Sequence, residues 1–152
     1  MKNKETVLPA PVLIVEDEAM IRSRLDLILS ELGYSQDMLI FAKNLAEAMQ
    51  IIASQPISLA LVDLGLPDGN GITLIEKLRG IDESALILVI SAWSTQQSLF
   101  ASIKAGANGY VLKERDDAEV LMSIRSILRG GAPIDPFIAR EILNQISTSN
   151  TP

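Results

Sequence analysis

Residues 58–71, Ser-Leu-Ala-Leu-Val-Asp-Leu-Gly-Leu-Pro-Asp-Gly-Asn-Gly, join an apolar run to an acid and then to a turn sequence. A short aliphatic run is typical of a buried strand, and a cluster of Pro, Gly and Asn residues is typical of a turn. Asp63 therefore stands where a strand ends and a loop begins. In open parallel sheets, ligands bind beyond the carboxyl ends of the strands, so the stretch predicts that Asp63 belongs to a functional site.

Polar residues follow three other apolar runs of the chain in the same manner. They are Glu16 and Asp17 after residues 12–15, Ser91 after residues 85–90, and Lys113 after residues 110–112. In a parallel sheet these strand ends lie at one edge. The five polar side chains, Asp63 included, are therefore expected to form one site.

Five strand-like runs alternate with five segments in which apolar residues recur at helical spacing. The strands are expected at residues 12–15, 38–42, 59–62, 85–90 and 110–112. The helices are expected from residue 19 to 32, from 45 to the residue before Pro56, from 71 to 78 with an end near Gly80, from 95 to 104, and from 117 to 128. Asn44 and Asp116 are expected to cap the second and fifth helices. This alternation predicts an α/β fold, a doubly wound five-stranded parallel sheet with helices on both faces.

The two ends of the chain are expected to lie outside this domain. Residues 1–11 are predicted to be a loose N-terminal leader, residues 12–131 the domain, and residues 132–152 a linker. Within the linker, apolar residues from Phe137 to Ile146 recur at helical spacing and predict a short helix. That helix either packs on the domain or forms a dimer contact. The residues from Ser147 onward are expected to be a tail.

The composition excludes several kinds of function. The 152 residues fit one domain, and a hydrophobic content of 48% is enough for a core. The chain has no Cys and no His, which excludes disulfides, a histidine base and thiolate or imidazole metal sites. Any bound metal should therefore be a hard cation on oxygen ligands. A net charge of −6 disfavours direct nucleic-acid binding, and the lack of a signal peptide or spanning run favours a cytoplasmic protein without a membrane.

The five polar residues suit phosphoryl chemistry. Their three carboxylates repel one another unless a cation lies between them, and Mg²⁺ commonly uses one or two carboxylates with waters and phosphate oxygens. A carboxylate can also attack phosphorus and form an acyl phosphate. Lys113 would supply positive charge for phosphate oxygens, and Ser91 a hydroxyl donor. The small Ala92 leaves room beside that hydroxyl.

This arrangement resembles the receiver domain of two-component response regulators, whose fold is flavodoxin-like with strand order 2-1-3-4-5. The resemblance covers roughly Pro11 to Arg129 and is carried by the pair Glu16-Asp17, Asp63 in its strand-and-turn stretch, the pair Ser91-Ala92, Tyr110 and Lys113. It implies that Asp63 accepts a phosphoryl group from a sensor histidine kinase or a phosphotransfer protein. It also implies a signalling domain rather than an enzyme.

The resemblance implies roles for the remaining site residues. These are Mg²⁺ binding by Glu16, Asp17, Asp63 and the backbone carbonyl of Gly65, phosphoryl contacts by Lys113, Ser91 and Ala92, and a rotamer change of Tyr110. The signal would then pass through the face made by the fourth helix, the fifth strand and the fifth helix. A second copy of the chain is a further expected partner, in a homodimer that forms on phosphorylation.

Two residues depart from the family pattern. Glu114 follows Lys113 where many members have proline. The cis peptide bond often found after that lysine is therefore less expected here, because a non-proline cis bond costs about 2.5–4 kcal/mol. Trp93 places a large indole at the mouth of the site, two residues beyond Ser91. We expect this indole to restrict access to the site and so to affect the lifetime of the phosphoryl group.

Lys113-Glu114 and residues 128–140 resemble the NarL/FixJ subfamily, in which a receiver precedes a LuxR-type helix-turn-helix domain that binds DNA. Too few residues follow Ile146 for such an output domain. The sequence is therefore interpreted either as part of a longer transcription regulator, which is the favoured reading, or as a stand-alone receiver.

Three other functions compete with a phosphorylated receiver. A phosphatase of the haloacid-dehalogenase type would carry a second acid two residues after its nucleophile, where this chain has Gly65. A nucleotide-binding domain would show a glycine-rich phosphate loop after a strand, and none is evident. A phosphorylation-independent interaction module on the receiver fold is disfavoured by the intact acids, Ser91 and Lys113, but stays open.

Overall fold

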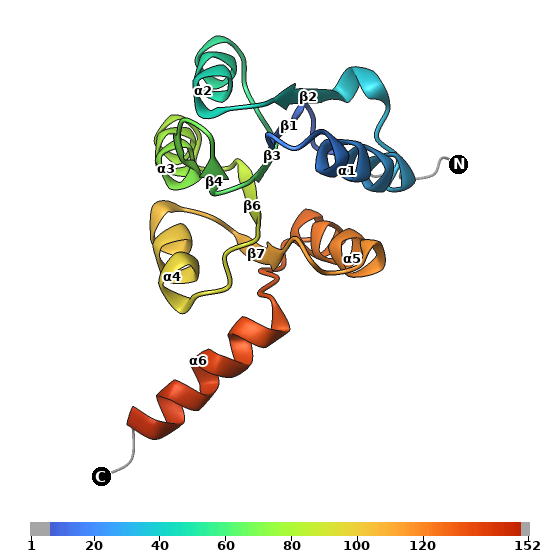
Figure 1. Cartoon of the computed structure of the whole chain (residues 1–152). Coiled ribbons are helices and arrows are strands. Elements are labelled where there is room, and N and C mark those ends of the chain that lie inside the picture. Colours follow the sequence, from blue (N-terminus) through green and yellow to red (C-terminus); the bar gives the residue numbers. More distant parts are fainter. Residues whose placement is uncertain (1–6, 150–152) are drawn as a thin grey trace.

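The structure, a computed structural model, describes residues 7–149 as a five-stranded parallel sheet with helices on both faces (Figure 1). The elements in chain order are β1 (Val12–Val15), α1 (Ala19–Glu31), the 3₁₀-helix η1 (Gln36–Met38), β2 (Leu39–Ala42), α2 (Leu45–Ser54), β3 (Leu59–Val62), β4 (Gly65–Leu66), β5 (Gly69–Asn70), α3 (Gly71–Ile81), β6 (Leu86–Ser91), α4 (Gln96–Ala105), β7 (Gly109–Leu112), α5 (Asp117–Leu128) and α6 (Pro136–Ser149). The main sheet has the order β2-β1-β3-β6-β7. Counted without the small β4–β5 pair, this is the order 2-1-3-4-5, which confirms the expected flavodoxin-like fold.

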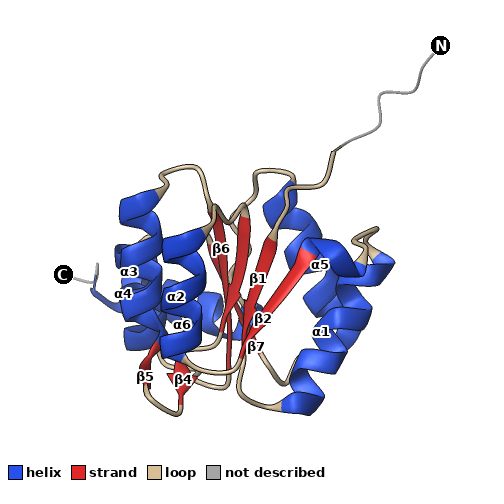
Figure 2. Ribbon diagram, turned by 90° about the horizontal axis from the view of Figure 1, so that it is seen from above, coloured by secondary structure: helices blue, strands red, loops and turns tan. Residues whose placement is uncertain are grey.

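The two layers of helices explain why the strands are apolar throughout. Helices α2, α3 and α4 cover one face of the sheet, and α1 and α5 cover the other (Figures 1 and 2). In β1, Leu13 and Val15 belong to the core on the α2–α3–α4 side, whereas Val12 and Ile14 belong to the core on the α1–α5 side. A strand that is buried on both faces carries apolar residues at every position.

The predicted helix caps are confirmed. Asn44 Oδ1 accepts a hydrogen bond from the amide of Glu47 at 2.8 Å, and Asp116 Oδ1 accepts one from the amide of Glu119 at 2.9 Å. Each cap satisfies an amide in the first turn that has no partner within its own helix.

Helix α3 ends close to the predicted position. It passes the expected last apolar position, Leu78, and ends at Ile81, which confirms an end near Gly80; the amide of Asp82 donates to the carbonyl of Leu78 at 2.9 Å. A glycine inside a helix costs only about 1 kcal/mol relative to alanine. Arg79 offsets that cost by donating to the carbonyls of Asp82 and Glu83 just beyond the helix.

The N-terminal segment is packed over its last residues rather than loose. Leu8 and Ala10 pack against the α1–α5 core. The hydroxyl of Tyr34 donates to the carbonyl of Pro9 at 2.8 Å, and that of Ser58 donates to Ala10 at 2.8 Å. These partners come from distant parts of the chain, so no local pattern reveals them. Residues 1–6 of the predicted leader lie outside the described residues.

The predicted short C-terminal helix is present and longer than expected. α6 runs to Ser149, so residues 147–149 of the expected tail are helical, while residues 150–152 lie outside the described part. Ile138 is fully buried, and α6 runs beside α4 (Figure 1). Of the two alternatives for this helix, packing on the domain therefore holds for its first turns. No helix in residues 7–149 is long and apolar enough to cross a membrane.

A buried acid attaches α6 to the edge strand of the sheet. Asp135, only 2% exposed, accepts two hydrogen bonds from the guanidinium of Arg115, both 2.7 Å long. The amide of Tyr110 donates to Pro133 at 2.8 Å, and the amide of Asp135 donates back to Tyr110 at 2.9 Å. The chain entering α6 therefore pairs with β7 at Tyr110.

The charge of Asp135 should stabilise the fold. Burial opposes ionisation of this carboxyl, but Arg115 and the amide of Phe137 outweigh it and hold the pKa of Asp135 below its usual value. A depressed pKa stabilises the folded state above the unfolded pKa, about 3.9, and this contribution is lost as the pH falls through the lower folded value. Asp135→Asn should lower the free energy of unfolding at pH 7 by about 1–3 kcal/mol. The difference from wild type should shrink at pH 3, as measured by urea unfolding.

The matched control is Glu114→Gln, which removes a charge from an exposed position in the neighbouring loop. It should change the free energy of unfolding little. Equal losses in both variants, or a loss for Asp135→Asn that stays the same at pH 3, would contradict the role given to the Asp135 carboxylate.

Candidate functional site

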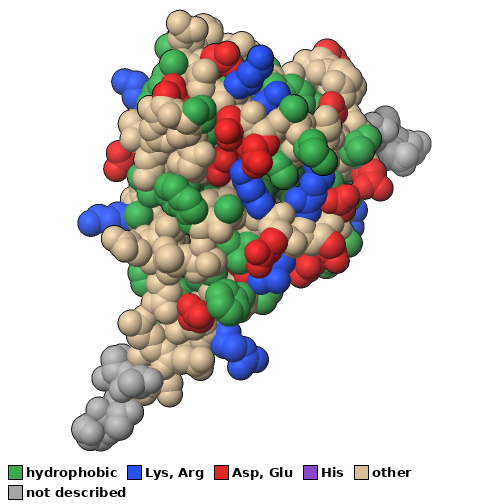
Figure 3. Space-filling model, viewed as in Figure 1, with side chains coloured by type: hydrophobic (Ala, Val, Ile, Leu, Met, Phe, Trp, Pro, Cys, Tyr) green, Lys and Arg blue, Asp and Glu red, His purple; other side chains and the backbone are tan. Residues whose placement is uncertain are grey.

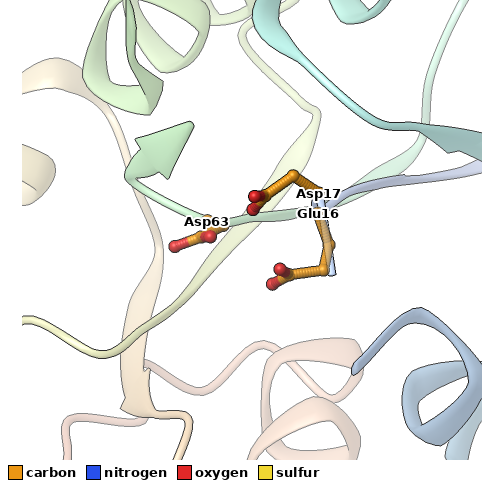
Figure 4. A group of neighbouring side chains, drawn as sticks. All are labelled: Glu16, Asp17 and Asp63. Carbon is orange, nitrogen blue, oxygen red and sulfur yellow. The ribbon is translucent and has the colours of Figure 1, made fainter. Parts of the chain in front are cut away.

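The predicted polar residues meet at the carboxyl edge of the sheet. Glu16 and Asp17 follow β1, Asp63 follows β3, Ser91 ends β6, and Lys113 follows β7. One carboxylate oxygen from each of the three acids lies within 4.8 Å of those from the other two, and Figure 4 shows these side chains side by side. Acidic and basic side chains also gather near the middle of this face in the space-filling view (Figure 3).

Two of the three acids are withdrawn from solvent. Glu16 is 1% exposed and Asp63 4% exposed, whereas Asp17 is exposed. Burial raises the pKa of the Asp63 carboxyl above its usual value, although Lys113 and the amide of Gly65 act in the opposite direction. Burial likewise raises the pKa of Glu16. The ionised forms of both groups are therefore less favourable here than in water.

The ammonium group of Lys113 lies among the carboxylates. Its Nζ is 2.9 Å from Asp63 Oδ2, 2.9 Å from Glu16 Oε1 and 3.2 Å from Glu18 Oε1. Burial favours the neutral amine, but Asp63 and Glu16 outweigh burial and raise the pKa of Lys113. The lysine therefore stays charged and balances part of the acid cluster. Sequence analysis did not predict Glu18 as a site residue, because an acid just before a helix usually interacts only with the N-terminus of that helix.

Trp93 joins the predicted switch residues through its backbone. Its amide donates to Ser91 Oγ at 3.0 Å, and its carbonyl accepts from the hydroxyl of Tyr110 at 2.6 Å. Both Ser91 and Tyr110 are fully buried, while Ala92 is exposed. The structure thus brings Ser91 and Tyr110 to one backbone segment, directly after the strand that ends beside Asp63.

The indole of Trp93 lies against the loop that follows Asp63. A Cβ placed on Gly65 would be 3.3 Å from Cζ2 of the indole, which is itself 40% exposed. The amide of Gly65 donates to Asp63 Oδ1 at 3.3 Å. Trp93 therefore covers one side of the Asp63 loop, at the mouth position expected from the sequence.

The turn after Asp63 is a short hairpin that a glycine allows to close tightly. β4 and β5 pair antiparallel, and the side chain of Asp68 in the connecting turn accepts from the amides of Leu45 and Ala46 at the start of α2. A Cβ on Gly71 would lie 2.3 Å from the carbonyl oxygen of Asp63, closer than any side chain can approach. The sequence predicted this stretch as a turn but not its pairing.

The peptide bond from Lys113 to Glu114 is trans. Within residues 7–149, the cis peptide bond is instead the one between Ala10 and Pro11. Arg24 of α1 reaches the loop after Lys113 and donates to the carbonyl of Lys113 at 2.9 Å and to that of Arg115. Sequence analysis did not single out Arg24, since nothing in the spacing of α1 indicates a partner almost ninety residues away.

Comparison with known proteins identifies the class that this fold and site define. Residues 12–125 match the family model of the response regulator receiver domain, which covers most of the chain. The chain belongs to the response regulator receiver domain family.

Individual relatives agree with this membership. The Fimbriae Z protein of Salmonella typhimurium is 29% identical over 144 residues, which make up 95% of this chain and 66% of that protein. The transcriptional regulatory protein PhoP of Escherichia coli K12 is 35% identical over 118 residues, 78% of this chain and 52% of that protein. The match to these curated relatives thus extends over between half and two thirds of their length.

A solved structure supports the same subfamily as the sequence. The LuxR-family two-component response regulator of Aurantimonas sp. SI85-9A1 superposes with a TM-score of 0.76 at 27% identity, covering 91% of this chain and 99% of that one. This agrees with the resemblance to the NarL/FixJ subfamily.

Removing the charge of Asp63 should stabilise the protein in the absence of a cation. The pKa of Asp63 is raised, so at pH 7 its ionised form opposes folding, an effect that grows as the pH rises from the unfolded pKa through the folded one. Asp63→Asn should raise the melting temperature at pH 7, with a chelator present, by roughly 2–4 °C, the shift that about 1 kcal/mol produces at this size. Thermal unfolding followed by circular dichroism measures it.

The control for this prediction is Glu76→Gln, which removes a charge from an exposed position of α3. It should leave the melting temperature nearly unchanged. A lower melting temperature for Asp63→Asn would mean that the ion pair with Lys113 outweighs the burial of the carboxylate.

Proposed function

We propose that this chain is a phosphorylation-switched receiver that takes a phosphoryl group on Asp63 from a sensor histidine kinase or a phosphotransfer protein. The observation that carries the proposal is the buried carboxylate of Asp63 at a strand end, 2.9 Å from the ammonium of Lys113 and beside two further acids. Membership of the receiver family supports it.

In the proposed transfer, a carboxylate oxygen of Asp63 attacks phosphorus while the bond from phosphorus to the histidine nitrogen of the donor breaks. The electron pair of that bond stays on the imidazole, and an acyl phosphate forms on Asp63. Lys113 is placed to pair with the phosphoryl oxygens and to offset their charge. Hydrolysis by water later returns the carboxylate and inorganic phosphate. The chain thus acts as a phosphoryl acceptor rather than as a turnover enzyme.

The donor set fits Mg²⁺ as the accompanying cation. Oxygen atoms of Glu16, Asp17 and Asp63 lie within 4.8 Å of one another, and hard divalent cations favour carboxylate ligands. Asp17 and Asp63 would hold the ion directly, with the carbonyl of Gly65, and Glu16 would help. When bound, Mg²⁺ would neutralise charge on the phosphoryl oxygens.

The switch would pass through Ser91, Trp93 and Tyr110. The hydroxyl of Ser91 would turn to the phosphoryl group, in place of its present contact with the amide of Trp93. Because the carbonyl of Trp93 holds the hydroxyl of Tyr110, a shift of this segment would release Tyr110 for a new rotamer. The signal would leave through the face of α4, β7 and α5.

The proposed setting is a cytoplasmic two-component system. The output would be a DNA-binding domain that controls transcription, with a homodimer formed on phosphorylation. The similarity to a LuxR-family response regulator and to PhoP supports this reading.

Incubation with Mg²⁺ and acetyl phosphate should add one phosphoryl group to the wild-type protein and none to Asp63→Asn. Intact-protein mass spectrometry reads the outcome, since the acyl phosphate needs only the carboxylate of Asp63, the cation and a donor. Glu76→Gln should be labelled like wild type. Labelling of the Asp63 variant would move the acceptor elsewhere, and no labelling of any protein would favour a phosphorylation-independent interaction module.

Trp93→Ala should shorten the lifetime of the phosphoryl group several-fold. The indole covers the Gly65 side of the Asp63 loop, so its removal should admit water to the acyl phosphate. The decay of the labelled mass after removal of the donor measures this lifetime. Phe100→Ala, which removes an exposed aromatic ring from α4, is the control and should decay like wild type. Equal rates in all three proteins would rule out the shielding role.

A further inference from the structure

Arg24 connects α1 to the loop that carries Lys113. Its side chain is mostly buried, at 21% exposed, and all three of its donor groups are engaged. Nη1 donates to the carbonyl of Lys113 at 2.9 Å, Nη2 donates to the carbonyl of Arg115, and Nε donates to the carboxylate of Asp117. The guanidinium therefore spans the whole connection between β7 and α5.

These contacts immobilise the backbone from which the Lys113 side chain extends. On one side of that residue, its amide donates to the carbonyl of Ser91 at 2.9 Å. On the other side, its carbonyl is held by Arg24. No proline stiffens the bond that follows, because Glu114 stands there. The planar fork of an arginine can hold two carbonyls at once, which the single ammonium of a lysine does less well.

A fixed backbone matters because the lysine side chain is long and flexible. Holding Nζ at 2.9 Å from both Asp63 and Glu16 restricts several rotatable bonds, and each such restriction is entropically unfavourable. A misplacement of about 1 Å at a reacting group can reduce a rate by about 100-fold. The position of the Lys113 backbone therefore bears directly on how well its ammonium meets a phosphoryl group.

We propose that Arg24 is a positioning residue for phosphoryl transfer to Asp63, acting through the backbone of Lys113. This inference rests on the proposed function, in which Asp63 accepts the phosphoryl group. Arg24 contacts no acid of the Glu16–Asp17–Asp63 cluster in the hydrogen bonds described above; its charged partner is Asp117. In a purely structural alternative, Arg24 serves only to form an ion pair with Asp117 between α1 and α5. Substitution of Asp117 distinguishes the two roles, because it removes the ion pair and keeps the bonds from Arg24 to the carbonyls of Lys113 and Arg115.

The experiment compares Arg24→Ala, Arg24→Lys and Asp117→Asn in the full chain. Acetyl phosphate labelling with Mg²⁺ should slow roughly 10- to 100-fold in both Arg24 variants. The labelling rate of Asp117→Asn should stay within about twofold of wild type, because Arg24 still donates to the carbonyls of Lys113 and Arg115. Mg²⁺ affinity, followed by Trp93 fluorescence, should also stay within about twofold in Arg24→Lys, since the acids that would hold the ion are unchanged.

A spectroscopic readout tests the positioning itself. In wild type the NMR signal of the Lys113 ammonium, held by three carboxylates, should be observable, and it should broaden or vanish in Arg24→Lys but persist in Asp117→Asn. If Arg24→Ala does not fold, Arg24→Lys carries the test. Wild-type labelling rates in Arg24→Lys, or an equal loss in Asp117→Asn, would overturn the proposal. If wild type takes no label, the proposed function fails, and the ammonium signal still decides whether Arg24 positions Lys113.

Discussion

One ammonium group among buried carboxylates is the constraint on which the site depends. The ammonium of Lys113 lies within 3.2 Å of carboxylate oxygens of Glu16, Glu18 and Asp63, so one positive charge offsets only part of the negative charge of the cluster. The sheet brings these groups together, because β1, β3 and β7 all end at the same edge. Burial makes this excess negative charge unfavourable, so a divalent cation would be chemically suited to offset it.

The same strand serves the site and the C-terminal helix. β7 ends at Leu112, directly before Lys113, and Tyr110 within β7 pairs with the segment that enters α6. Arg115 then holds Asp135 from the loop that Arg24 holds from the opposite side. The loop between β7 and α5 is thus held by α1 on one side and by the segment before α6 on the other. A change in the contacts of Lys113 would act on a segment that is already tied to α1 and to α6.

Local patterns in the sequence predict much of this molecule, and the remainder follows from contacts between distant residues. The apolar runs locate the strands, and because each run ends in a polar residue they also locate Asp63, Ser91 and Lys113 at one edge. The caps at Asn44 and Asp116 are local and could be predicted for the same reason. Arg24, Asp135 and the packed Leu8 could not, since their partners lie far along the chain. The end of α3 near Gly80 could also be predicted, since the helix ends at Ile81, whereas the bonds from Arg79 to the carbonyls just beyond it could not.

The most direct test of the central claim is a calorimetric titration of the protein with beryllofluoride, a stable mimic of a phosphoryl group, with and without Mg²⁺. The account predicts binding of one mimic per chain when Mg²⁺ is present, little binding without it, and a marked loss of affinity in Lys113→Ala. Binding that is equally strong without Mg²⁺ and unaffected by loss of the ammonium would contradict the view that the acids, the cation and Lys113 act together on one phosphoryl group.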